Sequence, residues 1–282
     1  MTTRPPTPEA LPAPVTDTHC HMDMSEGFAD ELYPVEQALS DAASVGVSRI
    51  VQVGCDVPGS SWAVDVAERF EAVLATVALH PNEAPRLAVR DELHESLARI
   101  DTLAGSSARV RAIGETGLDH YRTGPDGHAA QEESFRAHAE IARRRDLALV
   151  IHDRDAHQPI LAVLEELRRS GQLPDRVVFH CFSGDVDMAR HCVERGWYLS
   201  FAGPVTFKNG QPLRTALSVT PHELALTETD APFLTPHPHR GRPNSSVQLP
   251  WTVRAMAETW NADLATTCQA LHTNAEQVFG YW

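Results

Sequence analysis

The amino-acid sequence predicts a (β/α)₈ barrel, in which eight parallel strands form a closed ring with helices outside it. Three observations favour this fold class. The chain has 282 residues, a length that suits one such barrel. Short β-rich runs alternate with longer helix-like segments, as in a parallel sheet with right-handed crossovers. Residue types that bind metals recur at the ends of these runs, and a closed barrel would gather them at one mouth.

The β-rich runs are short and apolar, as expected for buried strands. They lie near residues 14–19, 48–54, 73–79, 110–114, 147–152, 176–180, 197–201 and 223–228. The segments between them have amphipathic helical patterns. From Gln131 to Arg145, for example, Phe135, Ala139 and Ala142 recur at helical spacing. The last segment, Gln248 to Trp282, is also helix-like and would complete the outer ring.

Two segments rich in proline stand apart from this alternation. Residues 1–13 contain several prolines, which support neither a regular helix nor a central strand. We expect them to form a flexible tail before a single barrel domain over residues 14–282. The run from Pro232 to Pro250 is expected to be a long loop after strand eight, close to the barrel mouth.

Composition limits the classes of function. No apolar stretch approaches the roughly 18 residues that a membrane helix needs, so no membrane segment is expected. The five cysteines form no C-x-x-C motif, which favours a reducing cytoplasm. The formal net charge of −14 disfavours extended electrostatic contact with a nucleic-acid duplex. It leaves open a nuclease that takes a chain end or a short single strand.

A metal site is predicted from six residues. His19 and His21 are spaced by one residue on an expected strand, so both imidazoles point to one face. The other candidates each lie at the end of a later β-rich run: Glu115, His152, His180 and Asp230. Imidazole and carboxylate together suit Mg²⁺, Mn²⁺ and Zn²⁺ to different degrees.

Seven short motifs occur in order along the chain. They are Asp17-Thr-His-Cys-His21, Leu79-His-Pro81, Gly114-Glu-Thr-Gly-Leu-Asp119, Ile151-His-Asp-Arg-Asp-Ala156, His180-Cys-Phe-Ser-Gly184, Glu228-Thr-Asp-Ala-Pro232 and Arg240-Gly-Arg-Pro-Asn244. With them the chain resembles the TatD family of metal-dependent deoxyribonucleases, from about residue 15 to the carboxyl terminus. The resemblance implies a (β/α)₈ metallohydrolase of the amidohydrolase superfamily. Thr116 and Ala78 depart from the usual family residues, which bears on substrate fit more than on chemistry.

The resemblance also implies a two-metal site. His19, His21, Glu115 and Asp230 would hold one ion, and Glu115 would bridge to a second ion held by His152 and His180. Two such ions activate water and neutralise charge on a phosphoryl oxygen. Asp230 and Glu115 are therefore the expected catalytic residues, with Asp230 orienting or deprotonating the water.

Other polar residues are candidates for contacts with the substrate. His80 either lines the substrate pocket or caps a turn. Arg154, Arg240 and Arg242 either bind phosphate or are solvated charges on loops. The remaining histidines of helix-like segments are expected at the surface, namely His94, His138, His191 and His272.

The predicted function is a metal-dependent deoxyribonuclease, a 3′-5′ exonuclease that uses two divalent ions to cleave phosphodiester bonds at DNA ends or in short single strands. The alternative is a metallohydrolase of a small ester, lactone, amide or phosphoester, because one scaffold can serve several chemistries. A barrel that binds a partner without catalysis is a third class, disfavoured by the intact ligand set. No obligate protein partner is expected.

Overall fold

The computed structural model describes residues 4–24 and 33–282. Within these residues all the strands belong to one sheet, whose hydrogen-bonded order follows the sequence from the first strand to the eighth. The strands are β1 Val15–Cys20, β2 Val47–Val53, β3 Val73–Val77, β4 Val110–Asp119, β5 Ala148–Arg154, β6 Val177–Phe179, β7 Tyr198–Phe201 and β8 Ala225–Thr227. The predicted number and order of strands are confirmed.

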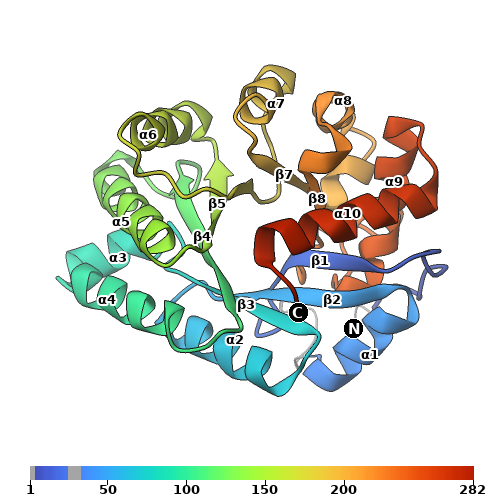
Figure 1. The fold of residues 1–282 in the computed structure, drawn as a ribbon, viewed down its shortest axis with the longest axis horizontal. Coiled ribbons are helices and arrows are strands. Elements are labelled where there is room, and N and C mark those ends of the chain that lie inside the picture. Colours follow the sequence, from blue (N-terminus) through green and yellow to red (C-terminus); the bar gives the residue numbers. More distant parts are fainter. Residues whose placement is uncertain (1–3, 25–32) are drawn as a thin grey trace. The chain divides into compact units, whose positions relative to one another are not determined.

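Helices follow the strands along the chain (Figure 1). They are α1 Val35–Ser44, α2 Val57–Arg69, α3 Ala84–Val89, α4 Leu93–Ala104, α5 Pro125–Arg144, α6 His157–Arg169, α7 Val186–Val193, α8 Gln211–Val219, α9 Leu249–Trp260 and α10 Leu264–Phe279. Short 3₁₀ helices are η1 Gly203–Thr206, η2 His222–Leu224 and η3 Ser246–Gln248. The alternation of parallel strands and helices is that of the predicted (β/α)₈ fold.

The described residues form two compact units. Unit 1 consists of the described residues within Met1–Gln52 and Cys181–Trp282, and unit 2 is Val53–His180. In unit 1, β1 pairs with β2 and β7 with β8, all in parallel. An isolated parallel bridge between Cys20 and Ala231 also joins the end of β1 to the segment after β8. The first and last strands of the order are therefore neighbours, as a barrel requires.

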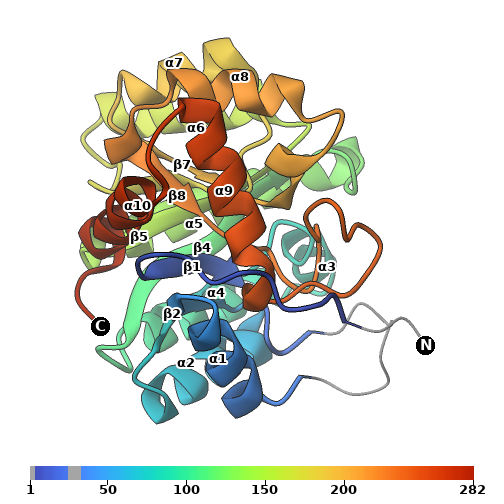
Figure 2. The same ribbon diagram turned by 90° about the vertical axis from the view of Figure 1, so that its right-hand side faces the viewer.

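The two C-terminal helices cover strands of unit 1. Helix α10 packs against β1 and β8, and α9 packs against α8 and η1. Figure 1 shows α10, in red, beside β1, and Figure 2 shows α9 and α10 side by side. Asn274 of α10 donates hydrogen bonds to the carbonyl oxygens of His222 (2.6 Å) and Ala225 (2.7 Å). This side chain ties the helix to the start of β8, so the predicted helical C-terminal segment has a defined partner.

Unit 2 contains three parallel pairings, β3 with β4, β4 with β5, and β5 with β6. Helix α2 packs against β3 and α5 against β4. Strand β4 runs five residues beyond its predicted end at Gly114 and ends at Asp119. Its extension pairs with β5, with Gly117 opposite His152 and Asp119 opposite Arg154. The longer strand carries Asp119 to the C-terminal end of this part of the sheet.

His138 lies in the interior of unit 2, and its expected place at the surface is wrong. Its side chain, on α5, is fully buried. Nε2 accepts a hydrogen bond from the Leu79 backbone N–H at 3.0 Å, and Nδ1 lies 2.7 Å from the Ser134 carbonyl oxygen. The imidazole therefore holds the backbone of Leu79, in the segment that connects β3 to His80. His94, by contrast, is largely exposed, as expected.

The N-terminal segment has no regular secondary structure between residues 4 and 14. Leu11 is buried and donates its N–H to the Val45 carbonyl at 3.0 Å. Arg254 of α9 donates a hydrogen bond to the Ala10 carbonyl at 3.1 Å. Residues 1–3 lie outside the described residues. The flexible tail over residues 1–13 and the domain boundary at residue 14 stay predictions.

Two further expectations concern membranes and disulfides. In the part of the chain that the structure describes, no helix is both long and apolar enough to cross a membrane. All five cysteines lie in that part, and none forms a disulfide.

The predicted loop after strand eight is interrupted by η3 and ends where α9 begins at Leu249.

Candidate metal centre

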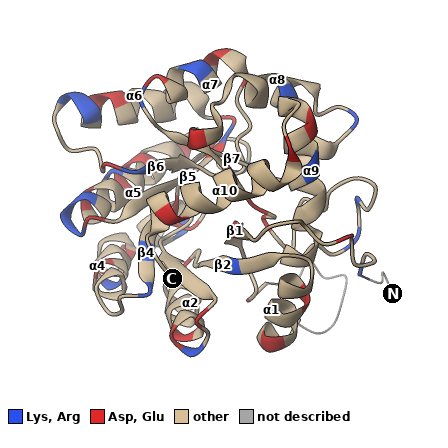
Figure 3. Ribbon diagram, turned by 45° about the vertical axis from the view of Figure 1, so that its right-hand side comes forward, with Lys and Arg blue, Asp and Glu red and all other residues tan. Residues whose placement is uncertain are grey.

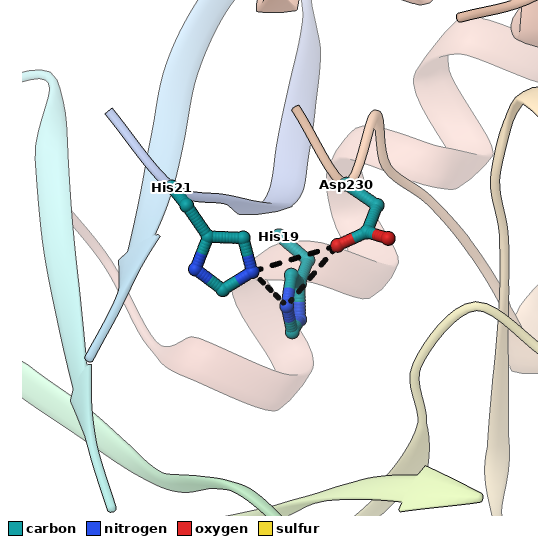
Figure 4. Close-up of side chains that lie close together, drawn as sticks. All are labelled: His19, His21 and Asp230. Atoms are coloured by element: carbon teal, nitrogen blue, oxygen red, sulfur yellow. Dashed lines mark hydrogen bonds and ion pairs between the residues drawn. The ribbon is translucent and has the colours of Figure 1, made fainter. Parts of the chain in front are cut away.

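Three of the predicted ligands meet in unit 1 and are here called the HxH cluster: His19, His21 and Asp230. His19 Nε2 lies 3.2 Å from His21 Nε2. Asp230 Oδ1 lies 3.8 Å from the first of these nitrogens and 3.5 Å from the second. Figure 4 shows the two rings and the carboxylate pointing toward one another. The structure thus brings together residues that are more than 200 positions apart in the sequence.

The backbone around β1 and β8 creates this arrangement. His19 and His21 are separated by one extended residue, so their side chains lie on the same face. The Asp230 N–H donates to the His19 carbonyl at 2.9 Å, and the His21 N–H donates to the Ala231 carbonyl at 2.7 Å. Asp230 has a φ of 54°, a left-handed conformation that costs free energy in a residue other than glycine. These contacts hold its carboxylate beside the histidines.

Asp17 binds the residue that precedes Asp230 of the HxH cluster. It is fully buried, and Thr229 donates to it twice, from its N–H at 2.9 Å and from its hydroxyl at 2.6 Å. Burial raises the pKa of Asp17 to about 6, although these hydrogen bonds oppose the shift. Because Thr229 immediately precedes Asp230, Asp17 fixes the carboxylate ligand through the backbone. Sequence reasoning included Asp17 only as the first residue of a motif.

A second group of donors lies in unit 2 and is here called the Glu115 cluster: His80, Glu115, His152 and His180. Glu115 Oε2 lies 2.8 Å from His180 Nε2, 3.0 Å from His152 Nδ1 and 3.8 Å from His80 Nε2. Burial by itself would raise the pKa of Glu115, but the charges of His180 and His80 and the hydrogen bonds from two rings hold it well below its usual range. A carboxylate is therefore maintained at the centre of three imidazoles.

His80 belongs to this cluster and also to a turn. Its Nδ1 accepts a hydrogen bond from the Asn82 N–H at 3.0 Å. That contact leaves Nε2 on the side of Glu115, and the His80 ring lies edge-on to the His152 ring with centroids 4.5 Å apart. The turn contact expected from the sequence is therefore present, and the same side chain also lies beside Glu115 and His152. Its role in substrate binding stays a prediction.

Two residues that the sequence did not single out adjoin the Glu115 cluster. Asp119 Oδ2 lies 3.4 Å from His152 Nε2 and accepts a hydrogen bond from Asn82 Nδ2 at 3.1 Å. Cys55 Sγ donates to Glu115 Oε1 at 3.4 Å. Metal-binding imidazoles commonly use their second nitrogen to bond a carboxylate, which orients the ring. The acidic end of the Gly114–Asp119 motif was the available signal for Asp119.

The predicted phosphate-binding arginines lie on exposed segments. The guanidinium carbon of Arg154 lies 4.2 Å from the centroid of the Tyr121 ring in unit 2. In unit 1 the guanidinium carbon of Arg240 lies 3.9 Å from the centroid of the Phe207 ring. Arg242 is also exposed, and its carbonyl oxygen accepts a hydrogen bond from the Thr235 hydroxyl. All three arginines are accessible, and two of them stack on aromatic rings.

The donor atoms of each cluster suit a divalent ion. In the HxH cluster, and among His80, Glu115 and His152, one donor atom from each residue lies within 4.8 Å of the others. Two atoms bound about 2.1 Å from one ion are about 3.0 Å apart in octahedral geometry and about 3.4 Å apart in tetrahedral geometry. In the HxH cluster the separation of 3.2 Å lies in that range, 3.5 Å lies close to its upper end, and the 3.8 Å between His19 and Asp230 exceeds it by about 0.4 Å. Both clusters are therefore candidate metal sites.

Comparisons with known proteins agree with this chemistry. The pattern of the family described as TatD related DNase matches residues 16–280. The metal-dependent hydrolase TatD of Mycobacterium tuberculosis is 40% identical over 272 residues, covering 94% of this chain and 98% of that protein. The 3′-5′ ssDNA/RNA exonuclease TatD of Cronobacter sakazakii is 34% identical over 249 residues, covering 86% and 91% respectively. The crystal structure of the TatD homologue YJJV from Escherichia coli K12 has a TM-score of 0.82 at 27% identity, covering 94% of this chain and 97% of that chain.

Proposed function

Because the chain belongs to the TatD family of metal-dependent hydrolases, we propose that it is a deoxyribonuclease that shortens DNA from the 3′ end. It is an enzyme that hydrolyses ester bonds with the help of metal. The observation that carries the proposal is the pair of imidazole and carboxylate clusters. The Cronobacter sakazakii relative, named as an exonuclease on single-stranded DNA and RNA, supports the choice of nucleic acid as substrate.

Two divalent ions complete the proposed site. His19, His21 and Asp230 would hold one ion, and His152 and His180 would hold the second, with Glu115 shared by both. The geometry within each cluster supports its own ion, and the sharing of Glu115 rests on the family resemblance. The bound ions would supply positive charge for the phosphoryl oxygens and acidify water. Mg²⁺, Mn²⁺ and Zn²⁺ are all candidates.

Asp230 is the proposed proton acceptor. Its side chain keeps 15% exposure, so water reaches it, whereas Asp17 is fully buried. The backbone bond to His19 and the Thr229 contact with Asp17 fix its position. Preorganisation of this kind reduces the cost of orienting the base when the substrate binds. Glu115 acts differently, because its negative charge orients the imidazoles around it.

The substrate is proposed to be a DNA end or a short single strand. The formal net charge of −14 disfavours extended contact with a duplex. Figure 3 shows basic and acidic residues interspersed along α6 and along α7. With basic residues interspersed in this way, only a few phosphates can be bound at once. The proposed substrate contacts are His80, Arg154, Arg240 and Arg242. A cytoplasmic location stays a prediction of the sequence.

Metal analysis tests the assignment of the ligands. His19→Ala and His152→Ala should each lower the number of bound ions per chain, measured by elemental analysis after removal of loosely bound metal. His94→Ala is the matched control, because His94 is exposed and outside both clusters. Full occupancy in both cluster variants would refute the two-site assignment.

Activity assays test the substrate. Metal-loaded protein should digest end-labelled single-stranded DNA, whereas Asp230→Asn should keep the fold and much of the metal while losing most turnover. Duplex DNA, RNA and a panel of lactones, amides and phosphoesters are assayed in parallel. Turnover of a small molecule without digestion of DNA would replace the proposal with the alternative of a small-molecule hydrolase.

A further inference from the structure

We propose that Tyr121 and Arg154 form a stacking site for one nucleobase of a single-stranded substrate, beside the Glu115 cluster. This inference rests on the proposed function and specifies how part of the substrate is recognised. Tyr121 is 63% exposed, and the Arg154 guanidinium carbon lies 4.2 Å from its ring centroid. Both side chains are exposed, and together they present a cationic group and an aromatic ring to solvent.

The position of the pair follows from the register of β4 and β5. Gly117 lies opposite His152, and Asp119 lies opposite Arg154 at the ends of the two strands. Arg154 is two residues beyond His152, which corresponds to about 6.6 Å along a strand. Tyr121 is two residues beyond Asp119, whose carboxylate contacts His152. The pair therefore lies at the C-terminal end of the strands that carry two residues of the Glu115 cluster and Asp119.

The turn that carries Tyr121 is held in place on several sides. The His120 N–H donates to the Arg154 carbonyl at 2.9 Å. The His120 ring stacks on the ring of His128 from α5, with centroids 3.6 Å apart and planes inclined by 10°. The Arg122 N–H donates to Asp119 Oδ1 at 2.8 Å. Because these contacts fix the backbone, little conformational entropy should be lost when a base binds to the displayed ring.

Packing does not account for the exposed ring. Within the described residues the large hydrophobic side chains at the surface are those of Val89, Tyr121 and Tyr281. A tyrosine with most of its area in water contributes little to the core. Aromatic rings paired with arginine recur where proteins bind single-stranded nucleic acid, because every base has a π-face and the guanidinium can also bond phosphate. The geometry thus fits a nucleotide better than a small uncharged ester.

The proposal predicts a loss that depends on the base. Tyr121→Ala should raise KM for a single-stranded oligonucleotide about ten-fold. Tyr121→Phe keeps the ring and should stay near the wild type. An oligonucleotide whose terminal nucleotides are abasic should bind all variants equally weakly. Tyr281→Ala removes another exposed tyrosine, one with 79% exposure, and is the matched control. Metal content should be the same in all variants.

A binding measurement without turnover separates this proposal from the proposed function. Stacking on Tyr121 should quench the fluorescence of 2-aminopurine at the 3′ end of an oligonucleotide titrated with wild-type protein in chelator. Tyr121→Ala should abolish that quenching, and Arg154→Ala should weaken it. If the wild type digests DNA but Tyr121→Ala leaves both KM and quenching unchanged, the stacking site is wrong and the nuclease assignment stands. Normal quenching without digestion would support the site and remove the nuclease assignment.

Discussion

Protonation of His138 should destabilise the folded protein between pH 6.5 and pH 4. Burial lowers the pKa of His138 from 6.5 to about 4, although a hydrogen bond to Ser134 opposes the shift. In the neutral ring, Nδ1–H donates to the Ser134 carbonyl and Nε2 accepts from the Leu79 N–H. A second proton on Nε2 would face that N–H. The folded state therefore binds fewer protons than the unfolded state in this window, so stability is present above pH 6.5 and is lost as the pH falls.

The size of the effect follows from the two pKa values. A difference of about 2.5 pKa units corresponds to about 3.4 kcal/mol when the pH lies below both values. At pH 4.5 the linkage relation gives about 2.5 kcal/mol, because the folded state is then only partly protonated at this site. The free energy of unfolding should fall by that amount more in the wild type than in His138→Gln, whose amide does not titrate.

Urea unfolding followed by circular dichroism, at pH 7.5 and pH 4.5 in chelator, measures the difference. His94→Gln is the matched control, because His94 is exposed, and its pH dependence should parallel that of the wild type. Other groups titrate in all three proteins and cancel in the comparison. Parallel curves for wild type and His138→Gln would refute the inference that the buried ring stays neutral.

Three further variants probe the site and its support. Glu115→Gln removes the charge at the centre of its cluster and should lower turnover by roughly 100-fold or more, with loss of metal; retention of both by the variant would contradict the role. Asp17→Asn leaves Thr229 one carboxylate acceptor short and should weaken metal binding about ten-fold by calorimetry, whereas unchanged affinity would refute a supporting role. Gly117 has a φ of 141°, and an added Cβ would lie 2.1 Å from a backbone oxygen of β5, so Gly117→Ala should cost about 1–3 kcal/mol in urea unfolding. Gly124→Ala, whose Cβ meets nothing within 4 Å, should cost far less, and equal losses would argue against the steric explanation.

The strands could be predicted because each is a short apolar run that is separated from the next by a helix-like segment. This pattern can be read from the sequence without knowledge of the tertiary contacts. The position at which β4 ends could not be predicted in the same way. Gly114-Glu-Thr-Gly117 has the composition of a loop, yet the strand continues beyond it, because after an irregularity between Ile113 and Thr116 the pairing with β5 resumes from Thr116 to Asp119. Helix α5 likewise begins at Pro125, before the predicted start at Gln131, because proline is favoured in a first helical turn.

The histidine and carboxylate clusters were predictable because ligand types recur at strand ends, which a parallel sheet gathers on one side. The supporting residues were not. His138 has the spacing of a helix residue, and its bond to Leu79 spans 59 positions, so no local pattern separates it from a surface histidine. Asp17 and Asp119 act through contacts with Thr229 and His152 that only the fold creates.

The claim that the protein shortens DNA from a 3′ end is tested most directly with one substrate pair. Metal-loaded protein, freed of contaminating nuclease, is incubated with a 5′-labelled linear single strand and with a closed single-stranded circle of the same sequence, and the products are resolved by length. We expect a ladder of products that shortens progressively from the 3′ end of the linear strand, with the circle left intact. Rapid cleavage of the circle would contradict this expectation and indicate an endonuclease built on the same clusters.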